Sequence, residues 1–282
     1  MTPSLPAIMV EPSVRAALLE DLGRAGDLTT GAIVPEHAQT DTALAARQAG
    51  VVAGLDYAVT AFRLIDPAIE VVIERADGSR VTPGDLIAVI RGPARGILTA
   101  ERTALNFLCH LSGVATATRG IVDAIAGSKA HVVCTRKTLP GLRAAQKYAV
   151  RVGGGSNHRF GLDDAVLIKD NHVAIAGGVG TAVARARAGV GHLVKIELEV
   201  DTLDQLQEAM ALGVDAVLLD NMDPAMLRQA VEVVGGRAIT EASGRIRPDT
   251  APAIAGSGID LLSVGWLTHS AAVLDIGLDH LR

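Results

Sequence analysis

The sequence predicts an α/β protein made of two parts, and three observations support that prediction. Between about residues 40 and 98, short apolar runs alternate with turn signals, a pattern typical of a small sheet. After Gly113, apolar runs recur about every 20–35 residues between Ala-rich helical stretches, which is the βα pattern of a parallel sheet. The chain is 49% apolar but holds only six aromatic residues (one Trp, two Tyr, three Phe), so its core must be aliphatic, as in helices packed on parallel strands.

The first part is expected to contain short strands. Strand-like runs lie in the segments ARQAGVVAGL, IEVVIERADGSRVTPGDLIAVIRG and GILT. Asp77-Gly78 is a dipeptide typical of a tight turn. We therefore expect a hairpin between residues 71–73 and Val81.

A helix is expected to follow these strands. Thr99 is placed to cap it, and the apolar residues that come next recur at helical spacing. Arg102, Asn106 and His110 fall at every fourth position, so they would form a polar stripe along this helix.

Six apolar runs of the second part are expected to be parallel strands. In chain order they are HVVCTRK, AVLIKD, LVKIELEV, AVLLDN, RAITEASG and LLSVGWL. Each run ends in charged or small polar residues, and in α/β barrels the carboxyl ends of the strands form the active-site face. Packing alone does not require such residues at six ends, so this rim is the predicted site.

One segment, residues 135–172, is strongly basic in a chain whose formal net charge is −5. It holds seven Lys or Arg against three Asp, around the loop formed by residues 153–156, GGGS. Arginine forks, lysine charges and accessible backbone N–H groups all match carboxylate and phosphate oxygens. The segment therefore predicts a small, highly charged substrate, although the glycines would also suit a flexible connector.

The cations of this segment divide by position. Arg136, Lys137 and Lys169 end predicted buried strands, where a ligand role is favoured. The three cations within residues 143–151 fall at helical spacing, which favours a solvated helix face, the usual environment of Lys and Arg.

Two acids end neighbouring predicted strands. Glu199 and Asp220 could hold Mg²⁺ with its waters, grip ribose hydroxyls or stabilise a developing positive centre. They could equally form structural ion pairs with the lysines of the rim. Glu197 is expected on the face opposite Glu199, where an ion pair on the interior or the exterior of the barrel is its favoured role.

Small residues follow the last two expected strands, at residues 243–244 (SG) and 264–266 (VGW). Such residues let backbone N–H groups approach a phosphate, although glycine also serves ordinary turns. His172 and His269 are expected to be structural. The sequence contains no catalytic-triad arrangement, P-loop or dinucleotide fingerprint.

The composition excludes several classes of protein. A pI near 5.9 and scarce aromatic residues argue against a nucleic-acid surface. Cys109 and Cys134 have no metal-ligand spacing and suggest no disulfide framework. The first residues lack a signal-peptide pattern and no apolar run reaches membrane-spanning length, so a soluble, cytoplasmic protein without membrane partners is expected.

The motifs resemble those of the quinolinate phosphoribosyltransferase family, the carboxylating nicotinate-nucleotide pyrophosphorylases. The similar stretches cover almost the whole chain: GDLTT, AERTALNFLCHLSGVAT, TRKTLPGLRAAQKYAVRVGGGSNHR, LIKDNH, IELEVD, LLDN, EASGRI and VGWLTHS. TRKT, GGSNHR and IKDNH in this order are highly specific, whereas LLDN alone is weak. The resemblance implies a pentosyltransferase of de novo NAD biosynthesis, which converts quinolinate and phosphoribosyl pyrophosphate to nicotinate mononucleotide, pyrophosphate and CO₂.

For the fold, the resemblance implies an N-terminal α/β sandwich over residues 1–112 and an incomplete, TIM-like α/β barrel over residues 113–282. The last residues could pack back on the N-terminal domain. The resemblance also implies a homodimer in which Arg102 reaches the active site of the partner subunit.

For the site, the resemblance implies that Arg136, His158 and Arg159 grip the two carboxylates of quinolinate. Lys137 and Lys169 would meet the phosphates of the cosubstrate, with Lys169 also near quinolinate.

The resemblance also assigns the remaining contacts. Glu199 and Asp220 would bind the ribose hydroxyls and Mg²⁺, directly or through water, and together with Lys137 they would be the catalytic residues. The loops after the last strands would hold the 5′-phosphate. The full substrate-binding set is Arg102, Thr135, Arg136, Lys137, His158, Arg159, Lys169, Glu199, Asp220, Ser243, Gly244, Arg245, Val264, Gly265 and Trp266.

Three other functions stay open at this point. A relative could act on nicotinate or another aromatic acid without decarboxylation, although arginines for two carboxylates favour quinolinate. A non-catalytic, transport-associated paralogue is expected to lose charged rim residues, and all of them are present. A phosphate-binding barrel isomerase would explain the late glycines but not so basic a segment.

Overall fold

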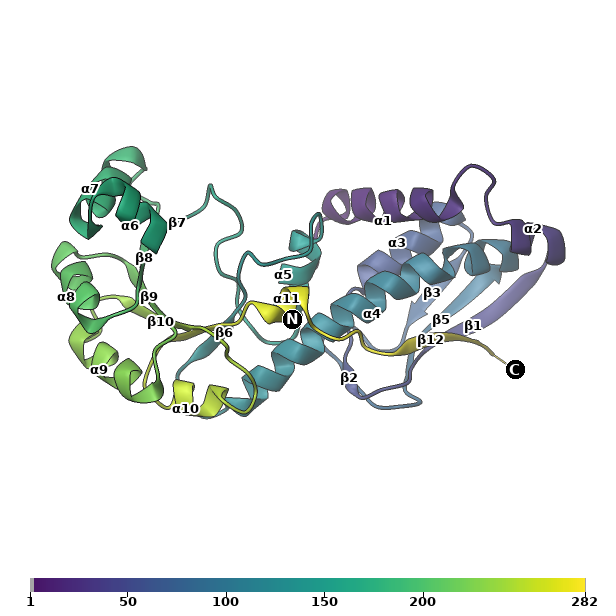
Figure 1. The fold of residues 1–282 in the computed structure, drawn as a ribbon. Helices are drawn as coiled ribbons and strands as arrows, with labels where there is room; N and C mark the ends of the chain where they lie inside the picture. The colour runs from purple at the N-terminus through teal and green to yellow at the C-terminus, as the bar shows by residue number, and fades with distance from the viewer. Residues whose placement is uncertain (1–2, 282) are drawn as a thin grey trace. The chain divides into compact units, whose positions relative to one another are not determined.

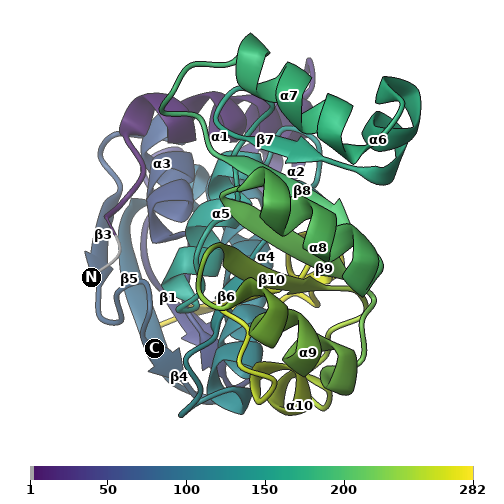
Figure 2. The same cartoon turned by 90° about the vertical axis from the view of Figure 1, so that its left-hand side faces the viewer.

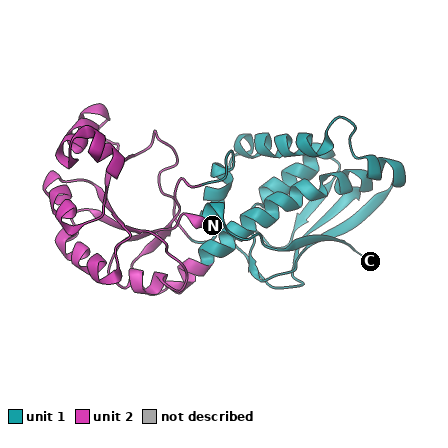
Figure 3. Cartoon of the chain, viewed as in Figure 1, with its two compact units in different colours: residues 1–119, 138–154, 267–282 teal, residues 120–137, 155–266 magenta. Residues whose placement is uncertain are grey.

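The computed structural model describes residues 3–281, and these form two compact units (Figure 3). Within that range, unit 1 takes the residues up to 119, residues 138–154 and the residues from 267 onward. Unit 2 takes residues 120–137 and 155–266. The expected domains follow sequence order, whereas these units interleave along the chain.

Unit 1 contains a four-stranded antiparallel sheet in the order β12-β1-β5-β3 (Figure 1). A separate two-stranded ladder pairs β2 with β4. The strands are β1 (Gln39–Ala46), β2 (Gly50–Val51), β3 (Glu70–Ile73), β4 (Arg80–Val81), β5 (Leu86–Pro93) and β12 (Ile276–His280). The helices are α1 (Ala7–Leu22), α2 (Leu28–Ile33), α3 (Leu55–Ile65), most of α4 (Ala94–Ala124) and α5 (Arg143–Val152).

The expectation of a hairpin at residues 77–78 is wrong. β3 pairs with β5 and β4 pairs with β2, so these two strands are not partners. Asp77 instead accepts hydrogen bonds from the backbone N–H groups of Gly54 and Leu55, at 2.9 and 3.2 Å, where α3 begins. The Tyr148 hydroxyl also donates to Asp77, at 2.7 Å. The turn signal therefore marks a residue that caps a helix, not a reversal between paired strands.

The expected helix is present as α4, but Thr99 does not cap it. α4 begins at Ala94, directly after β5, and Thr99 lies inside the helix. The Thr99 hydroxyl donates to Asp27 Oδ2 at 3.1 Å, and Asp27 is the residue that caps α2. Thr99 thus joins two helices rather than starting one.

The middle of the basic segment forms α5, and one part of its expected environment is wrong. Lys147 is only 2% exposed, so it is not on a solvated face. Gly153 follows α5 closely packed against α4, where a Cβ atom would lie 2.5 Å from Ala115 O. Gly154 has a φ of +92° and lies against the Arg119 guanidinium. Close packing therefore accounts for two of the three adjacent glycines.

Unit 2 is a six-stranded parallel sheet in the order β6-β11-β10-β9-β8-β7. All six expected strands are present: β6 (His131–Val133), β7 (Val166–Ile168), β8 (Ile196–Val200), β9 (Ala216–Asp220), β10 (Ile239–Ser243) and β11 (Leu261–Ser263). Among residues 3–281, β6 and β7 are the edges of this sheet, so the barrel is incomplete, as expected.

The helices of unit 2 lie along one face of this sheet (Figures 1 and 2). They are α6 (Asp170–Ala176), α7 (Val179–Gly189), α8 (Leu203–Leu212), α9 (Pro224–Val234) and α10 (Ala251–Ala255); the short α11 (Trp266–His269) begins at the end of the unit. None of the helices within residues 3–281 is both long enough and apolar enough to cross a membrane.

Two aspartates tie neighbouring strands together at their amino ends. Asp215 accepts a hydrogen bond from the backbone N–H of Ile196 at 2.9 Å and forms an ion pair with Lys195 at 2.6 Å. Asp260 accepts the N–H of Thr240 at 2.9 Å and forms a similar ion pair with a lysine. This end of the sheet is stabilised by local contacts, which leaves the carboxyl ends for function.

Candidate active site

The carboxyl ends of the unit 2 strands surround a cavity of about 380 Å³, called the rim cavity below. Leu167, Leu218 and Ser263 form part of its wall. The other lining residues were all expected from the sequence: Thr135, Arg136, Lys137, His158, Arg159, Lys169, Glu199, Asp220 and Ser243.

Parallel pairing explains why these residues meet. Residues 135–137 follow β6, while Asp220, Ser243 and Ser263 are the last residues of β9, β10 and β11. The carboxyl ends of parallel strands lie at one edge of a sheet, so side chains far apart in sequence converge there. Lys169 follows β7, and its backbone N–H donates to His172 Nδ1 at 2.9 Å where α6 begins, which gives His172 the structural role expected for it.

Two arginines carry donors that lack acceptors. The Nε atoms of Arg136 and Arg159 are buried and have no hydrogen-bond partner among residues 3–281. Burial, and then the charge of Arg136, lower the pKa of Arg159. Buried donors are nearly always paired in folded proteins, so this arrangement calls for an acceptor from a ligand. An anion with two carboxylates would supply it and would offset the repulsion between the two guanidinium groups.

The two lysines of the rim are held differently. Lys169 Nζ donates to Glu199 Oε2 at 2.9 Å, which is an ion pair of the kind weighed for this acid. Lys137 lies along Gly265, where a Cβ atom would come within 2.9 Å of Lys137 Cδ. Its backbone N–H donates to Thr135 Oγ1 at 3.0 Å. Gly265 therefore contributes by leaving room for the lysine side chain.

Glu199 and Asp220 present carboxylates from the adjacent strands β8 and β9. Asp220 Oδ2 accepts a hydrogen bond from the Asn221 amide at 2.6 Å. Two carboxylates at one cavity wall form a donor set that suits a hard cation such as Mg²⁺, which prefers oxygen ligands and keeps several of its waters.

The loops after β9 and β10 hold unusual backbone conformations. Asn221 and Arg245 have φ values of +53° and +49°, a region that residues other than glycine rarely adopt. Gly244 has a φ of +104°, and a Cβ atom there would collide with the Asn221 side chain. Such strained loops occur at binding sites that must bring backbone N–H groups close to a ligand.

Several expected residues do not line the rim cavity. Arg102 lies on α4 in unit 1, beside a separate cavity of about 350 Å³ that Asp27 and Thr99 also line. Trp266 donates from Nε1 to Ile246 O at 2.8 Å, a structural contact. The remaining members of this group are Gly244, Arg245, Val264 and Gly265.

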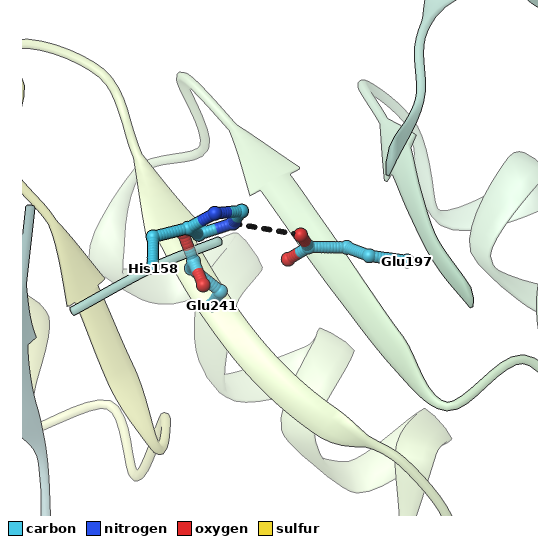
Figure 4. A group of neighbouring side chains, drawn as sticks. All are labelled: His158, Glu197 and Glu241. Carbon is cyan, nitrogen blue, oxygen red and sulfur yellow. Dashed lines mark hydrogen bonds and ion pairs between the residues drawn. The ribbon is translucent and has the colours of Figure 1, made fainter. Parts of the chain in front are cut away.

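The His158 ring lines the cavity, and both of its nitrogens are bonded to the protein. Figure 4 shows the bond to Glu197. Nδ1 accepts the Arg159 backbone N–H at 2.8 Å, so Nε2 must carry the ring proton. Nε2 donates to Glu197 Oε2 at 2.9 Å and lies 3.7 Å from Glu241 Oε1. Glu197 has a partner inside the unit, because it accepts the hydrogen bond from His158 Nε2. The expectation that it points away from Glu199 is wrong, since residues two apart on a strand share a face.

Glu241 and Ser263 are rim or near-rim residues that the sequence did not reveal. Glu241 lies inside the apolar strand β10 and is only 2% exposed. Because side chains alternate along a strand, Glu241 points to the same face as Ser243. An acid two residues before a predicted rim residue is the signal that identifies it.

Comparison with known families gives two matches that together span most of the chain. Residues 27–112 match the family described as "Quinolinate phosphoribosyl transferase, N-terminal domain". Residues 114–279 match the family described as "Quinolinate phosphoribosyl transferase, C-terminal domain".

Related proteins agree with these matches. The chain is 46% identical over 272 residues to the nicotinate-nucleotide pyrophosphorylase [carboxylating] of Mycobacterium leprae, covering 95% of each chain. It is 42% identical over 261 residues to the probable nicotinate-nucleotide pyrophosphorylase [carboxylating] of Bacillus subtilis, covering 93% of this chain and 90% of that one.

Solved structures show the same architecture. NadC from Streptococcus pyogenes superposes with a TM-score of 0.95 at 44% identity, over 99% of this chain and 100% of that one. The nicotinate-nucleotide pyrophosphorylase from Francisella tularensis gives a TM-score of 0.94 at 39% identity, over 99% and 98%. The fold, the rim and the sequence likeness lead to one conclusion: this chain belongs to the quinolinate phosphoribosyltransferase family.

Proposed function

We propose that the chain transfers the phosphoribosyl group of phosphoribosyl pyrophosphate to the ring nitrogen of quinolinate, with loss of one carboxylate as CO₂, and so makes nicotinate mononucleotide for NAD biosynthesis. The observation that carries this proposal is the pair of buried Arg136 and Arg159 Nε–H groups without acceptors at the rim cavity. Quinolinate has two adjacent carboxylates, and the named activity of the relatives supports the same reaction.

Charge neutralisation is the first task of the rim. Quinolinate and phosphoribosyl pyrophosphate are both anions and repel each other in solution. Arg136 and Arg159 would hold the carboxylates while Lys137 and Lys169 meet the phosphates. Holding both substrates with the pyridine nitrogen near C1 of the ribose turns an encounter of two anions into a step within one complex.

The acids act on the sugar. As pyrophosphate leaves, positive charge develops on the ribose, and Glu199 and Asp220 are placed to stabilise it electrostatically. The same two carboxylates would hold Mg²⁺, which when bound would neutralise phosphate charge. The Lys169–Glu199 ion pair at 2.9 Å supports this proposal, because it would keep one cation and one acid together between the phosphate and the ribose.

Decarboxylation needs no nucleophile from the protein. Once the ring nitrogen is alkylated, the cationic ring stabilises the electron pair left on C2 when its carboxylate departs as CO₂, and C2 then takes up a proton from water. The C3 carboxylate remains in place, held by an arginine. This agrees with the absence of a nucleophile motif in the sequence.

His158 is assigned an indirect role in this proposal. The resemblance implies a direct contact with quinolinate, but both ring nitrogens are engaged by Arg159 N–H and by Glu197. We therefore propose that His158 orients Arg159.

We further propose a homodimer, with Arg102 offered to the partner's site, in the cytoplasm. Arg102 is exposed on α4 beside the cavity that it lines in unit 1, so it is available to a second chain. Cys109 and Cys134 form no disulfide within residues 3–281, which is usual in proteins of a reducing compartment.

One assay tests the proposed reaction. Purified protein is incubated with quinolinate, phosphoribosyl pyrophosphate and Mg²⁺, and CO₂ and nicotinate mononucleotide are measured. We expect both products in equal amounts. Product from nicotinate but not from quinolinate would show the alternative reaction without decarboxylation and would overturn the substrate assignment.

A further inference from the structure

Two glutamates lie buried side by side beneath the rim cavity. Glu197 on β8 and Glu241 on β10 flank the central strand β9, and their side chains converge below the His158 ring (Figure 4). Their side chains are 11% and 2% exposed. Two carboxylates this close in a dry interior cannot both be ionised without a large electrostatic cost.

The hydrogen bonding around this pair is short of one donor. Glu197 Oε1 and Glu241 Oε1 are buried and have no partner among residues 3–281. His158 cannot supply the donor, because its one N–H is directed to Glu197 Oε2 at 2.9 Å. The Ser263 hydroxyl also contacts Glu241, but it leaves Oε1 unsatisfied. One proton on Glu241 would supply a donor to Glu197, with which Glu241 shares a side-chain hydrogen bond.

The surroundings of Glu241 favour that proton. Burial, and then the charge of Glu197, raise the pKa of Glu241 to about 7, against a smaller opposing effect of His158. The groups that face it are Glu197 from β8, His158 from the loop after residue 156, and Ser263 from β11.

Hydrogen bonds connect this cluster to the backbone of Arg159, which lines the rim cavity. Glu197 holds His158 Nε2, and His158 Nδ1 holds the backbone N–H of Arg159 at 2.8 Å. The Arg159 side chain in turn donates from Nη1 to Ala165 O at 3.0 Å, while its buried Nε–H has no partner among residues 3–281. The His158 ring therefore fixes the backbone of an arginine that lines the proposed quinolinate pocket.

We propose that Glu241 is a positioning residue of the quinolinate pocket: as a neutral acid it donates a hydrogen bond to Glu197, which fixes His158 and, through it, Arg159. This inference rests on the proposed function, because the pocket it serves is that of quinolinate. It assigns a task to a residue that touches neither substrate. The same three side chains also have a geometry that a metal ion could use, and the test below separates the two cases.

The test compares two replacements of Glu241. Glu241→Gln keeps a hydrogen-bond donor without any charge, whereas Glu241→Ala removes the donor. We expect Glu241→Ala to raise the KM for quinolinate about tenfold, the effect of one lost hydrogen bond to a charged group, with a smaller change in the KM for phosphoribosyl pyrophosphate. Glu241→Gln is expected to recover quinolinate binding to within about threefold of the wild type.

A control variant shows whether an effect is specific to Glu241, and two results would contradict the proposal. Glu208→Ala, on the exposed face of α8, is the matched control and should leave both KM values unchanged. If Glu241→Gln is as impaired as Glu241→Ala, the site needs a charged carboxylate, for an ion pair or a metal, and the proposal is wrong. Equal increases in both KM values would also overturn it, because they indicate general damage.

A second measurement needs neither variant nor activity. Nitrogen-15 NMR of the histidine ring in the wild-type protein reports which nitrogen carries the proton. We expect His158 as the Nε2–H tautomer between pH 6 and pH 7, without substrate. An Nδ1–H tautomer would contradict the positioning chain. Wild-type protein that turns over no quinolinate but shows the expected tautomer would refute the proposed function alone.

Discussion

At the residue scale, the proposed function assigns Arg136 and Arg159 to recognition of the acid and not of the sugar phosphate. Both arginines line the rim cavity with Lys137 and Lys169, and their Nε–H groups have no partner among residues 3–281. Removing either guanidinium should cost about 2–4 kcal/mol of quinolinate binding, the scale of a buried charged contact. We expect Arg159→Ala to raise the KM for quinolinate far more than the KM for phosphoribosyl pyrophosphate in steady-state assays.

The control for this variant is Arg228→Ala, which removes an exposed arginine from α9. It should leave both constants at the wild-type values. Similar increases for both substrates in Arg159→Ala would indicate that the arginine shapes the whole cavity and does not select the dicarboxylate.

The same scale shows which site residues a sequence can reveal. Arg136, Lys169 and Asp220 were predictable because a charge at the end of an apolar run has no packing reason to be there. Glu241 lies within such a run, where an acid looks like a break in the pattern, and only the pairing of β8, β9 and β10 brings it to His158. The expectation that Lys147 faces solvent was wrong, because helical spacing predicts which residues share a face but not whether another element covers that face.

At the element scale, α4 carries two glycines with opposite requirements. A Cβ atom on Gly113 would collide with the backbone at Ala272, whereas nothing lies within 4 Å of one on Gly120. Gly113→Ala should destabilise the protein by about 1–3 kcal/mol through overpacking. Gly120→Ala should stabilise it by up to about 1 kcal/mol, because alanine is the better helix former.

Urea unfolding followed by circular dichroism measures both variants on the same helix. The two changes are chemically identical, so the opposite signs isolate the contact with Ala272. Two variants of equal stability would show that α4 and the segment at residue 272 are not in close contact.

Elements were predictable where the pattern was local. The six strands of unit 2 were recognised because each is a short apolar run between helical stretches. The turn at residues 77–78 was misread because Asp77 bonds to Gly54, a partner that no local pattern contains. The expectation that Thr99 caps α4 was wrong, because β5 runs directly into α4 and the helix begins before its best capping residue.

At the scale of the whole molecule, the free energy of unfolding should decrease both when the pH falls and when it rises. Hydrogen bonds from Lys195 and Ile196 outweigh burial and lower the pKa of Asp215 below its ordinary value of 3.8. That contribution is present above this value and is lost as the pH falls below it.

Glu241 has the opposite effect on the pH dependence of stability. Its pKa is raised from 4.5 to about 7, so the folded protein retains a proton that the unfolded chain has released. Its contribution is present below 4.5 and is lost as the pH rises through 7. We expect the free energy of unfolding in urea to fall between pH 5 and pH 8 in the wild type.

The Glu241→Gln variant isolates this effect, because glutamine cannot ionise. Its free energy of unfolding should fall less over the same range. An identical slope in both proteins would assign the pH dependence to other groups, and a flat wild-type profile would mean that Glu241 is already ionised.

The pairing of β12 with β1 has a consequence for the order of folding. The side chains of Thr40 and His280, which are hydrogen bonded beside this ladder, are 240 positions apart, and all of unit 2 lies between them in sequence. On the ribosome, β1 must therefore wait at an open sheet edge until unit 2 has been made, and exposed edges invite pairing with other chains. The unit that is begun first is thus the one completed last, and β12 is the segment whose arrival ends its exposure to aggregation.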